Sequence, residues 1–346
     1  MTNTEWFKQA KFGMMLHWGL YTLLGGEYKG QQVRDYAEWI QSYFRIPICE
    51  YEKLSAAFNP IGFDAEEYAK TAKNCGMQYI VLTAKHHDGF AMYHSKCDKF
   101  NVYDATPFHR DILEEFSFAC KKYGLKLGIY YSQDLDWHHP HGGGYNSNHM
   151  GNSGTTWDNS WDFTGKKNYD ICFDEKILPQ IKEIMSSYGD LCLAWFDVPL
   201  TISADQSEQI YNTVKELQPD CLINSRLGNG KYDYVSLGDN EIPERIEITA
   251  EKNIDYRDIG GFKPSPFSLY ESACTLNGTW GFSYYDKHWK SAQKLAENKA
   301  HLNSLGINYL LNVGPDPLGR IPVEAKQLLE KTGAFFTAGI AKNSDV

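Results

Sequence analysis

The stretch Leu-Cys-Leu-Ala-Trp-Phe-Asp at residues 191–197 joins an apolar run to a single acidic residue. Six apolar residues in a row, just after a long helical pattern, predict a short buried strand. Asp197 is the first charged residue at the carboxyl end of that strand. A buried carboxylate costs free energy unless it is hydrogen-bonded or has a chemical function. We therefore take Asp197 as a candidate functional carboxylate.

Strand and helix patterns alternate on both sides of this stretch. Buried strands are predicted at 11–19, 79–87, 126–132, 191–197, 221–226, 234–237, 267–271 and 308–314. Helices are predicted at 65–76, 110–124, 166–189, 204–217, 288–305 and 323–336. Eight strands, mostly separated by helices, predict a parallel α/β sheet closed into a (β/α)8 barrel of the TIM type. No good helix pattern follows the fifth and sixth strands, between residues 227 and 266.

Chain length, net charge and cysteine spacing limit the number of domains and the kinds of partner that the protein can have. A barrel of this type accounts for the 346 residues as one catalytic domain, 1–346. The net charge of −10 argues against nucleic acid and against an anionic membrane surface as partners. No apolar run approaches the roughly 20 residues of a membrane span, and the amino terminus shows no signal-peptide pattern. The eight cysteines are scattered singly, as free thiols in a reducing cytoplasm are, so we expect a cytoplasmic protein.

Polar side chains stand at every predicted strand end. Because the active site of a (β/α)8 barrel lies at the carboxyl ends of its strands, these residues are expected to meet. The pattern indicates a polar, hydroxyl-rich substrate. The ends are His17-Trp18, His86-His87-Asp88, Tyr130-Tyr131, Asp197, Asn224-Ser225-Arg226, Gly238-Asp239, Glu271 and Asn312.

The histidines raise the alternative of a catalytic metal, which the spacing does not favour. The first strand carries His-Trp-Gly rather than His-x-His, and adjacent residues such as His86 and His87 point to opposite faces of a strand. The loop histidines 138, 139 and 141 have no carboxylate at metal-ligand spacing. We therefore expect no metal. Each histidine is interpreted either as an ordinary hydrogen-bonding residue or as a neutral imidazole that bonds hydroxyl groups of the substrate. The sequence also has no Walker loop, no dinucleotide motif and no G-x-S-x-G elbow, so no cofactor is expected. Gly142-Gly143-Gly144 is interpreted as flexible chain.

What remains for chemistry is a set of carboxylates. A pair of them facing an aromatic and histidine-lined pocket is typical of glycoside hydrolysis, with one ionised and one held protonated. Two long irregular segments, 25–47 and 134–165, are candidates for the walls of such a pocket. The candidate carboxylates are Glu38, Asp197, Asp239, Glu241, Glu244 and Glu271.

With these motifs in order, the sequence resembles the α-L-fucosidases of glycoside hydrolase family 29 along nearly its whole length. The motifs are Trp6-Phe7 through Gly13, His17-Trp18-Gly19, Ala37-Glu38-Trp39, Lys85-His86-His87-Asp88-Gly89-Phe90, Tyr130-Tyr131-Ser132, Leu135-Asp136-Trp137, Trp195-Phe196-Asp197, Asn224-x-Arg226, Glu271 with Thr279-Trp280-Gly281, and Leu310-Leu311-Asn312-Val313-Gly314-Pro315.

The resemblance implies a retaining exo-hydrolase that removes terminal α-linked L-fucose from fucosylated oligosaccharides or glycoconjugates through a covalent fucosyl-enzyme. Asp197 matches the family's nucleophile. Trp195 and Trp280 match aromatic residues beside the sugar ring and its C5 methyl group. The remaining fucose-binding positions are matched by His17, Glu38, Trp39, His86, His87, Tyr130 and Arg226.

The acid/base is not fixed by the resemblance. The family's spacing after the fifth-strand arginine selects Glu244, whereas a subgroup with a glutamate after a Gly-Asn pair selects Glu241. Glu271 is the third candidate, although a structural role bonding its neighbours is the preferred interpretation of that residue.

The chain departs from the common family layout because no β-sandwich is seen after the barrel. Substrate contacts of that module are then absent or supplied by another subunit, which leaves a homo-oligomer open, and the linkage preference is not determined. Three alternatives remain: the same chemistry on a related L-sugar such as an α-L-galactoside, a fucose-binding protein without turnover, and a metal-dependent hydrolase. An apolar environment around C5 would disfavour the galactoside, whose hydroxyl would be unpaired there.

Overall fold

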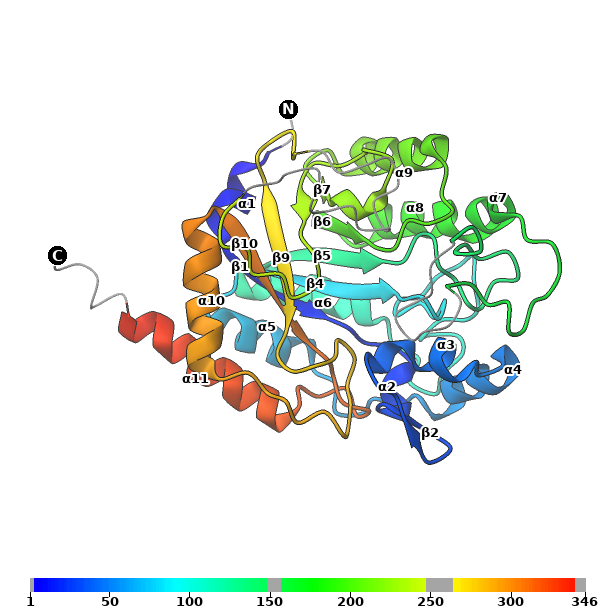
Figure 1. The fold of residues 1–346 in the computed structure, drawn as a ribbon, viewed down its shortest axis with the longest axis horizontal. Helices are drawn as coiled ribbons and strands as arrows, with labels where there is room; N and C mark the ends of the chain where they lie inside the picture. Colours follow the sequence, from blue (N-terminus) through cyan, green and yellow to red (C-terminus); the bar gives the residue numbers. More distant parts are fainter. Residues whose placement is uncertain (1–2, 148–156, 247–263, 340–346) are drawn as a thin grey trace.

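The fold is seen in a computed structural model that describes residues 3–147, 157–246 and 264–339 (Figure 1). Eight strands form one sheet in which every ladder is parallel. Their bounds are β1 Phe12–Leu16, β4 Tyr79–Lys85, β5 Lys126–Tyr131, β6 Leu191–Phe196, β7 Leu222–Ile223, β8 Val235–Ser236, β9 Tyr270–Thr275 and β10 Ile307–Val313. A small antiparallel pair, β2 Glu27–Tyr28 and β3 Gln31–Gln32, stands apart from this sheet.

The strand order shows that the sheet is a barrel. Neighbours run β7-β6-β5-β4-β1-β10-β9-β8, so the two outer strands are the fifth and sixth of the barrel series. A parallel bridge between Asn224 and Tyr234, just beyond β7 and just before β8, joins these outer strands. The backbone N–H of Tyr234 also donates to the carbonyl of Ile223 at 3.2 Å. The predicted (β/α)8 barrel is confirmed.

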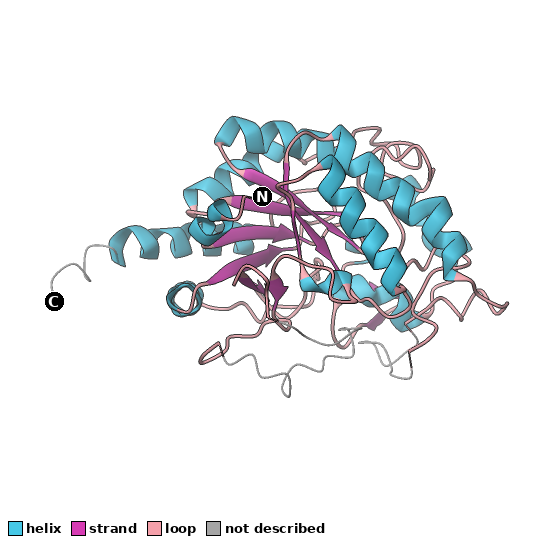
Figure 2. Ribbon diagram, turned by 90° about the horizontal axis from the view of Figure 1, so that it is seen from above, coloured by secondary structure: helices cyan, strands magenta, loops and turns pink. Residues whose placement is uncertain are grey.

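Helices surround the strands, as the view from above shows (Figure 2). Asp64 and Ser203 cap α5 and α9 by accepting backbone N–H bonds, which is what short polar residues do at helix starts. The α-helices are α1 Glu5–Ala10, α2 Tyr21–Leu24, α3 Ile40–Phe44, α4 Ile48–Tyr51, α5 Ala65–Asn74, α6 Ile112–Tyr123, α7 Tyr169–Cys172, α8 Leu178–Ser187, α9 Ala204–Leu217, α10 Ala292–Ser304 and α11 Val323–Gly339. Shorter turns are η1 Ala37–Trp39, η2 Glu52–Ala57, the π-helical turn η3 Phe173–Ile177 and η4 Ser225–Leu227.

The predicted gap in the helix pattern is present in the structure. Within the described parts of residues 227–266 no α-helix follows β7 or β8, where only the short turn η4 is found. Residues 247–263 of that segment lie outside the described chain.

The strand predicted at 267–271 is displaced in the structure, where β9 begins at Tyr270. Residues 265–269 form a turn instead: the Ser265 hydroxyl accepts the backbone N–H of Phe267 and of Leu269, and Ser268 has a left-handed φ of 55°. The expectation that Glu271 ends a strand is therefore wrong, because Glu271 is the second residue of β9.

A buried ion cluster ties the segments after β4 and β5 to the π-helical turn η3. Lys85 and Lys176 both bond one oxygen of Asp136, at 3.1 and 2.9 Å, and Lys176 also pairs with Asp98 at 2.5 Å. The Lys176 ammonium further donates to the carbonyl of Gly89 at 3.0 Å. Buried charges are tolerated only when paired in this way, so the cluster fixes these segments relative to one another.

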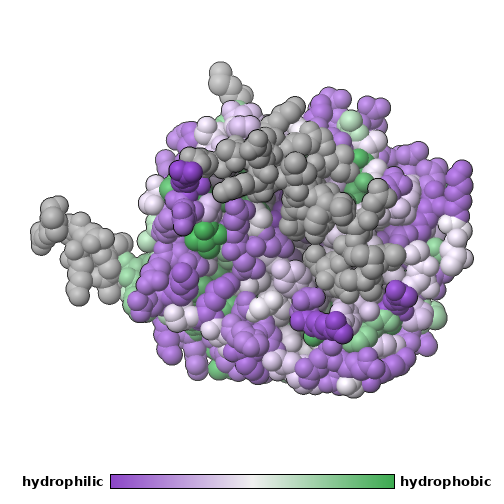
Figure 3. Space-filling model, viewed as in Figure 1, coloured by the Kyte–Doolittle hydropathy of each residue, from purple (hydrophilic) through white to green (hydrophobic). Residues whose placement is uncertain are grey.

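The described surface facing the viewer in Figure 3 is largely hydrophilic, with small scattered apolar patches. Among the described residues, no helix combines the length and the apolar character needed to cross a bilayer.

Candidate active site

A cavity lies at the carboxyl ends of the barrel strands. Nine of the thirteen predicted site residues line it, and a tenth, Tyr130, contacts Asp197 through its hydroxyl. Tyr36, Val198 and Asp239 also line the cavity. The free space among these side chains is about 20 Å³, room for little more than one water. The lining residues are His17, Tyr36, Glu38, Trp39, His86, His87, Trp195, Asp197, Val198, Arg226, Asp239 and Trp280.

Asp197 follows directly after β6 and is held from three sides. Its carboxylate accepts the Tyr130 hydroxyl at 2.9 Å and Arg226 Nη1 at 3.0 Å. Its backbone N–H donates to the side chain of Gln133 at 2.9 Å. The next residue, Val198, has a φ of 51°, which is strained for a β-branched residue and turns the chain sharply away. Such strain persists only where the surroundings over-determine it, as they do here.

The segment behind Asp197 is fixed by a second buried carboxylate. Asp134 accepts the backbone N–H groups of Leu200, Thr201 and Ile202 at 2.9, 2.6 and 2.7 Å. Burial raises the pKa of Asp134 to about 6, and the three backbone donors oppose that rise. These bonds hold the chain after Asp197 against the loop that follows β5.

Arg226 connects Asp197 to a carboxylate that the sequence analysis did not select as acid/base. Its Nη1 bonds Asp197, while its Nη2 bonds Asp239 at 2.6 Å and the carbonyl of Leu237 at 2.9 Å. The guanidinium lies over the ring of Trp195, 4.7 Å from its centre. One guanidinium therefore bonds both carboxylates, one on each terminal nitrogen, and holds them at the same side of the cavity.

The three predicted histidines meet in this cavity as neutral imidazoles. Burial is the main cause in each case: it lowers the pKa of His17 to about 4 and the pKa of His86 and of His87 well below 6.5. The Nδ1 atom of His17 pairs with the oxygen of Asn312 at 2.7 Å, and that of His87 with Ser132 Oγ at 2.6 Å. The rings of His17 and His87 therefore each keep their second nitrogen for a hydroxyl of a bound sugar.

The expectation that His86 and His87 point to opposite faces is wrong. β4 ends at Lys85, so the alternation of a strand no longer applies, and both rings line the cavity with their centres 4.1 Å apart. In the described parts of the chain, no group of three or more His, Cys, Asp or Glu side chains is arranged to hold a metal ion.

Glu38 and the tryptophans form the opposite wall. Glu38, in η1, accepts the backbone N–H of Gly281 at 2.7 Å and the Thr279 hydroxyl at 3.3 Å, and burial raises its pKa to about 7. Trp39 packs edge-on against His87, with ring centres 5.0 Å apart. Trp280 lies 5.1 Å from the ring of His17 and supplies an apolar surface.

The long loop 134–165 contributes to this wall through two of its tryptophans. Trp137 and Trp157 are buried and pack against Trp39 at 5.2 and 5.3 Å. The interpretation of Gly142-Gly143-Gly144 as flexible chain is wrong. A Cβ atom at Gly142 would overlap the backbone oxygen of Asp136, so this stretch is glycine because the chain packs too closely for a side chain.

None of the three glutamates predicted as acid/base lines the cavity. Glu244 is exposed, and Glu241 accepts the backbone N–H of Gly238 at 2.7 Å. Glu271 lies deeper in the barrel, where it accepts the Tyr79 hydroxyl at 2.6 Å and the indole N–H of Trp195 at 3.0 Å. Burial raises the pKa of Glu271 to about 7. Its contacts match the structural role preferred for it from the sequence.

Two polar residues of the cavity were not among the predicted site residues, although Asp239 was one of the candidate carboxylates. Asp239 had a usable signal, since it stands just beyond the sixth strand, and in the structure it lines the cavity and bonds Arg226. Tyr36 had none beyond its closeness in sequence to Glu38.

Comparison with known proteins agrees with this geometry. A family model described as alpha-L-fucosidase matches residues 1–339. The chain is 26% identical to a putative alpha-L-fucosidase of Caenorhabditis elegans over 96% of its length, and to the human plasma alpha-L-fucosidase over the same share. It spans 64% and 67% of those two proteins, about two thirds of their length. The solved structure of alpha-L-fucosidase AlfC from Lactobacillus casei with α-L-fucose product is 62% identical, with a TM-score of 0.91 over 98% of this chain and 100% of that one.

Proposed function

The chain belongs to the α-L-fucosidase family, and we propose on that premise that it is a retaining exo-α-L-fucosidase acting on fucosylated oligosaccharides or glycoconjugates. The observation that carries the proposal is the position of Asp197 at the end of β6, held between Tyr130 and Arg226 in a cavity of neutral histidines and tryptophans. The imidazoles suit the hydroxyl groups of fucose, and Trp280 suits its C5 methyl group.

In the first step, an oxygen of Asp197 attacks the anomeric carbon as the bond to the leaving oxygen breaks. The acid/base gives its proton to that oxygen. In the second step the same group takes a proton from water, whose oxygen attacks the anomeric carbon and releases Asp197. Tyr130 and Arg226 orient the Asp197 carboxylate for the attack.

We assign the acid/base role to Asp239. It lines the cavity and shares Arg226 with Asp197, whereas Glu244 is exposed and Glu241 accepts a backbone N–H group outside the cavity lining. Glu271 does not line the cavity, and its carboxylate accepts the Tyr79 hydroxyl and the indole N–H of Trp195. Glu244, Glu241 and Glu271 remain testable alternatives, and the experiment below separates all four.

The test is hydrolysis of 4-nitrophenyl α-L-fucoside by the wild type and by Asp197→Gly, Asp239→Ala, Glu241→Ala, Glu244→Ala and Glu271→Ala, each with and without azide. We expect wild-type turnover and a loss of at least about 10³-fold in Asp197→Gly, which azide restores as the β-fucosyl azide. Asp239→Ala should yield the α-fucosyl azide, because azide replaces water at the fucosyl-enzyme. Glu244→Ala, at an exposed position, is expected to keep wild-type turnover and to form no α-fucosyl azide.

Each contrary result has a defined meaning. Azide products of α configuration from a glutamate variant, and not from Asp239→Ala, would move the acid/base role to that glutamate. Fucose binding without turnover by the wild type would favour the binding protein, and release of galactose in preference to fucose would favour the α-L-galactosidase.

We also place the protein in a reducing compartment, the cytoplasm. All eight cysteines are free, and six of them are buried. Free buried thiols are the usual state in reducing compartments. Cell fractionation with antibody detection tests this placement, and recovery of the protein from an extracellular fraction would refute it.

A further inference from the structure

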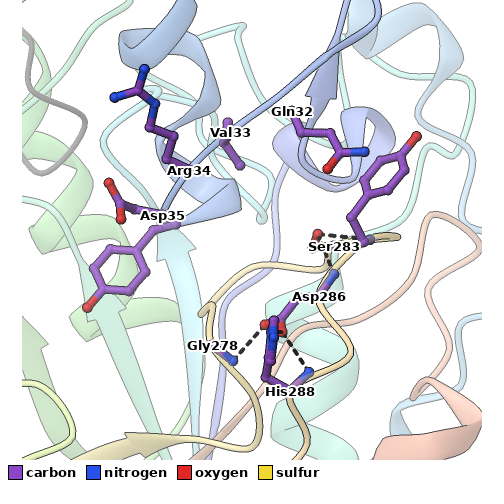
Figure 4. Close-up of a pocket in the computed structure, with 10 residues that line it drawn as sticks. Gln32, Val33, Arg34, Asp35, Gly278, Ser283, Asp286 and His288 are labelled. Atoms are coloured by element: carbon purple, nitrogen blue, oxygen red, sulfur yellow. Dashed lines mark hydrogen bonds and ion pairs between the residues drawn. The ribbon is translucent and has the colours of Figure 1, made fainter.

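A second, larger cavity adjoins the one that contains Asp197. Its volume is about 470 Å³, within the range of sites that hold small ligands (Figure 4). One wall is the segment 32–36, which begins at the last residue of β3, and the other is the loop 278–288 that follows β9. Tyr36 lines both cavities, so they meet at this side chain.

The two walls are continuous in sequence with the fucose-binding wall. Two residues beyond Tyr36 the chain reaches Glu38, and two residues beyond Gly278 it reaches Trp280. The segments are also bonded to each other: the Ala37 N–H donates to the Thr279 hydroxyl at 2.8 Å, besides the bond between Gly281 and Glu38. A ligand that extends from the Asp197 cavity past Tyr36 would therefore meet a wall that is fixed to the catalytic wall.

The lining of the larger cavity fits an uncharged, hydroxyl-rich ligand. Arg34 and Asp35 bring opposite charges, and neither makes a hydrogen bond or ion pair within the described parts of the chain. Figure 4 shows them on the wall that faces Asp286 and His288. Asp286 is already committed to its own loop, accepting the N–H groups of Gly278 and His288 at 2.6 and 3.0 Å. The charged side chains of the lining that remain available to a ligand are thus those of Arg34 and Asp35, and the neutral side chains of Gln32 and Ser283 line the cavity beside them.

We infer that this cavity is the subsite for the sugar that carries the fucose, a neutral hexose or N-acetylhexosamine. The inference rests on the proposed fucosidase function. The fucose occupies the Asp197 cavity, and the leaving sugar lies past Tyr36 between the two walls, where Arg34 donates to its hydroxyl or carbonyl oxygens and Asp35 accepts from its hydroxyls. Tyr36 separates the two rings.

The test compares two kinds of substrate that share the fucose and differ in the leaving group. One is 4-nitrophenyl α-L-fucoside. The other is a panel of fucosyl-N-acetylglucosamines with α1,3, α1,4 and α1,6 linkages, of which the best wild-type substrate is used for the variants. The variants are Arg34→Ala and Asp35→Ala. The matched control is Lys8→Ala with Glu5→Ala, an exposed pair of opposite charges on α1.

For Arg34→Ala and Asp35→Ala we expect kcat/KM on the disaccharide to fall about tenfold, the effect of one lost bond to a charged group. On the aryl fucoside we expect less than a twofold change, with unchanged inhibition by free L-fucose. The control should change neither substrate. Equal losses on both substrates, or no loss on the disaccharide, would overturn the subsite. A wild type that hydrolyses no substrate would instead refute the fucosidase function itself.

Discussion

The buried Glu271 leads to a quantitative prediction about stability and pH. Its side chain is fully buried and accepts the Tyr79 hydroxyl and the Trp195 indole N–H, and burial raises its pKa from 4.5 to about 7. A carboxyl group whose pKa is raised in the folded state stabilises the fold below its unfolded pKa, and this contribution disappears as pH rises through the folded pKa. For Glu271 this stabilising contribution is lost between about pH 4.5 and pH 7, and it amounts to roughly 3 kcal/mol of unfolding free energy.

The variant Glu271→Gln isolates the pH-dependent contribution of Glu271 to the unfolding free energy, because glutamine is neutral at every pH and can bond both neighbours. We expect the unfolding free energy of the variant, minus that of the wild type, to rise by roughly 3 kcal/mol from pH 4.5 to pH 8. Any constant effect of the substitution cancels in this comparison. Urea denaturation followed by tryptophan fluorescence at four or five pH values measures it.

The exposed residue Glu216 on α9 provides the control variant Glu216→Gln, which makes the same chemical change at the surface. Glu38, whose pKa burial also raises to about 7, is present in both proteins, so the Glu271 variant should retain part of the wild-type pH dependence. Parallel curves for wild type and Glu271→Gln would refute the reasoning, since they would mean that Glu271 titrates alike in both states.

Three further predictions concern the site and its supports. Asp134→Ala should lower the unfolding free energy by roughly 2–4 kcal/mol, because three buried backbone N–H groups lose their acceptor. A urea denaturation midpoint equal to that of the wild type would contradict this prediction. Arg226→Lys should reduce kcat/KM on the aryl fucoside by about 100-fold or more with unchanged circular dichroism, since one ammonium cannot bond two carboxylates as a guanidinium does. Near-normal turnover would show that activity does not need the bonds of Arg226 to both Asp197 and Asp239. Dialysis against EDTA should leave the activity unchanged, and a loss that one added divalent cation reverses would revive the metal-dependent hydrolase.

Much of the barrel could be predicted because its strands are continuous apolar runs. The run that ends at Asp197 forms β6 as predicted, and α9 has the bounds that the pattern gives it. Both depend on local signals: side-chain burial along a strand, and a capping serine followed by an amphipathic helix.

The predictions failed where a side-chain hydrogen bond, rather than the local sequence pattern, determines the position of a residue. The apolar residues before Tyr270 suggest a strand, but Ser265 bonds their backbone into a turn, which moves Glu271 from the end of a strand to its start. The place of Asp239 depends on Arg226, thirteen residues earlier in the sequence and on another strand end. Neither side-chain bond has a periodic signature in the sequence.

The close packing of Gly142 and Gly143 bears on how this enzyme could be re-engineered. A loop beside an active site is the usual place to randomise when a new linkage preference is sought. Here, any side chain at Gly142 or Gly143 would collide with Asp136 or Asp134, the residues that join the ion cluster and support the chain after Asp197. A library built there would consist mainly of misfolded members, whereas Arg34 and Asp35, exposed and unpaired within the described chain, are free to vary without that loss.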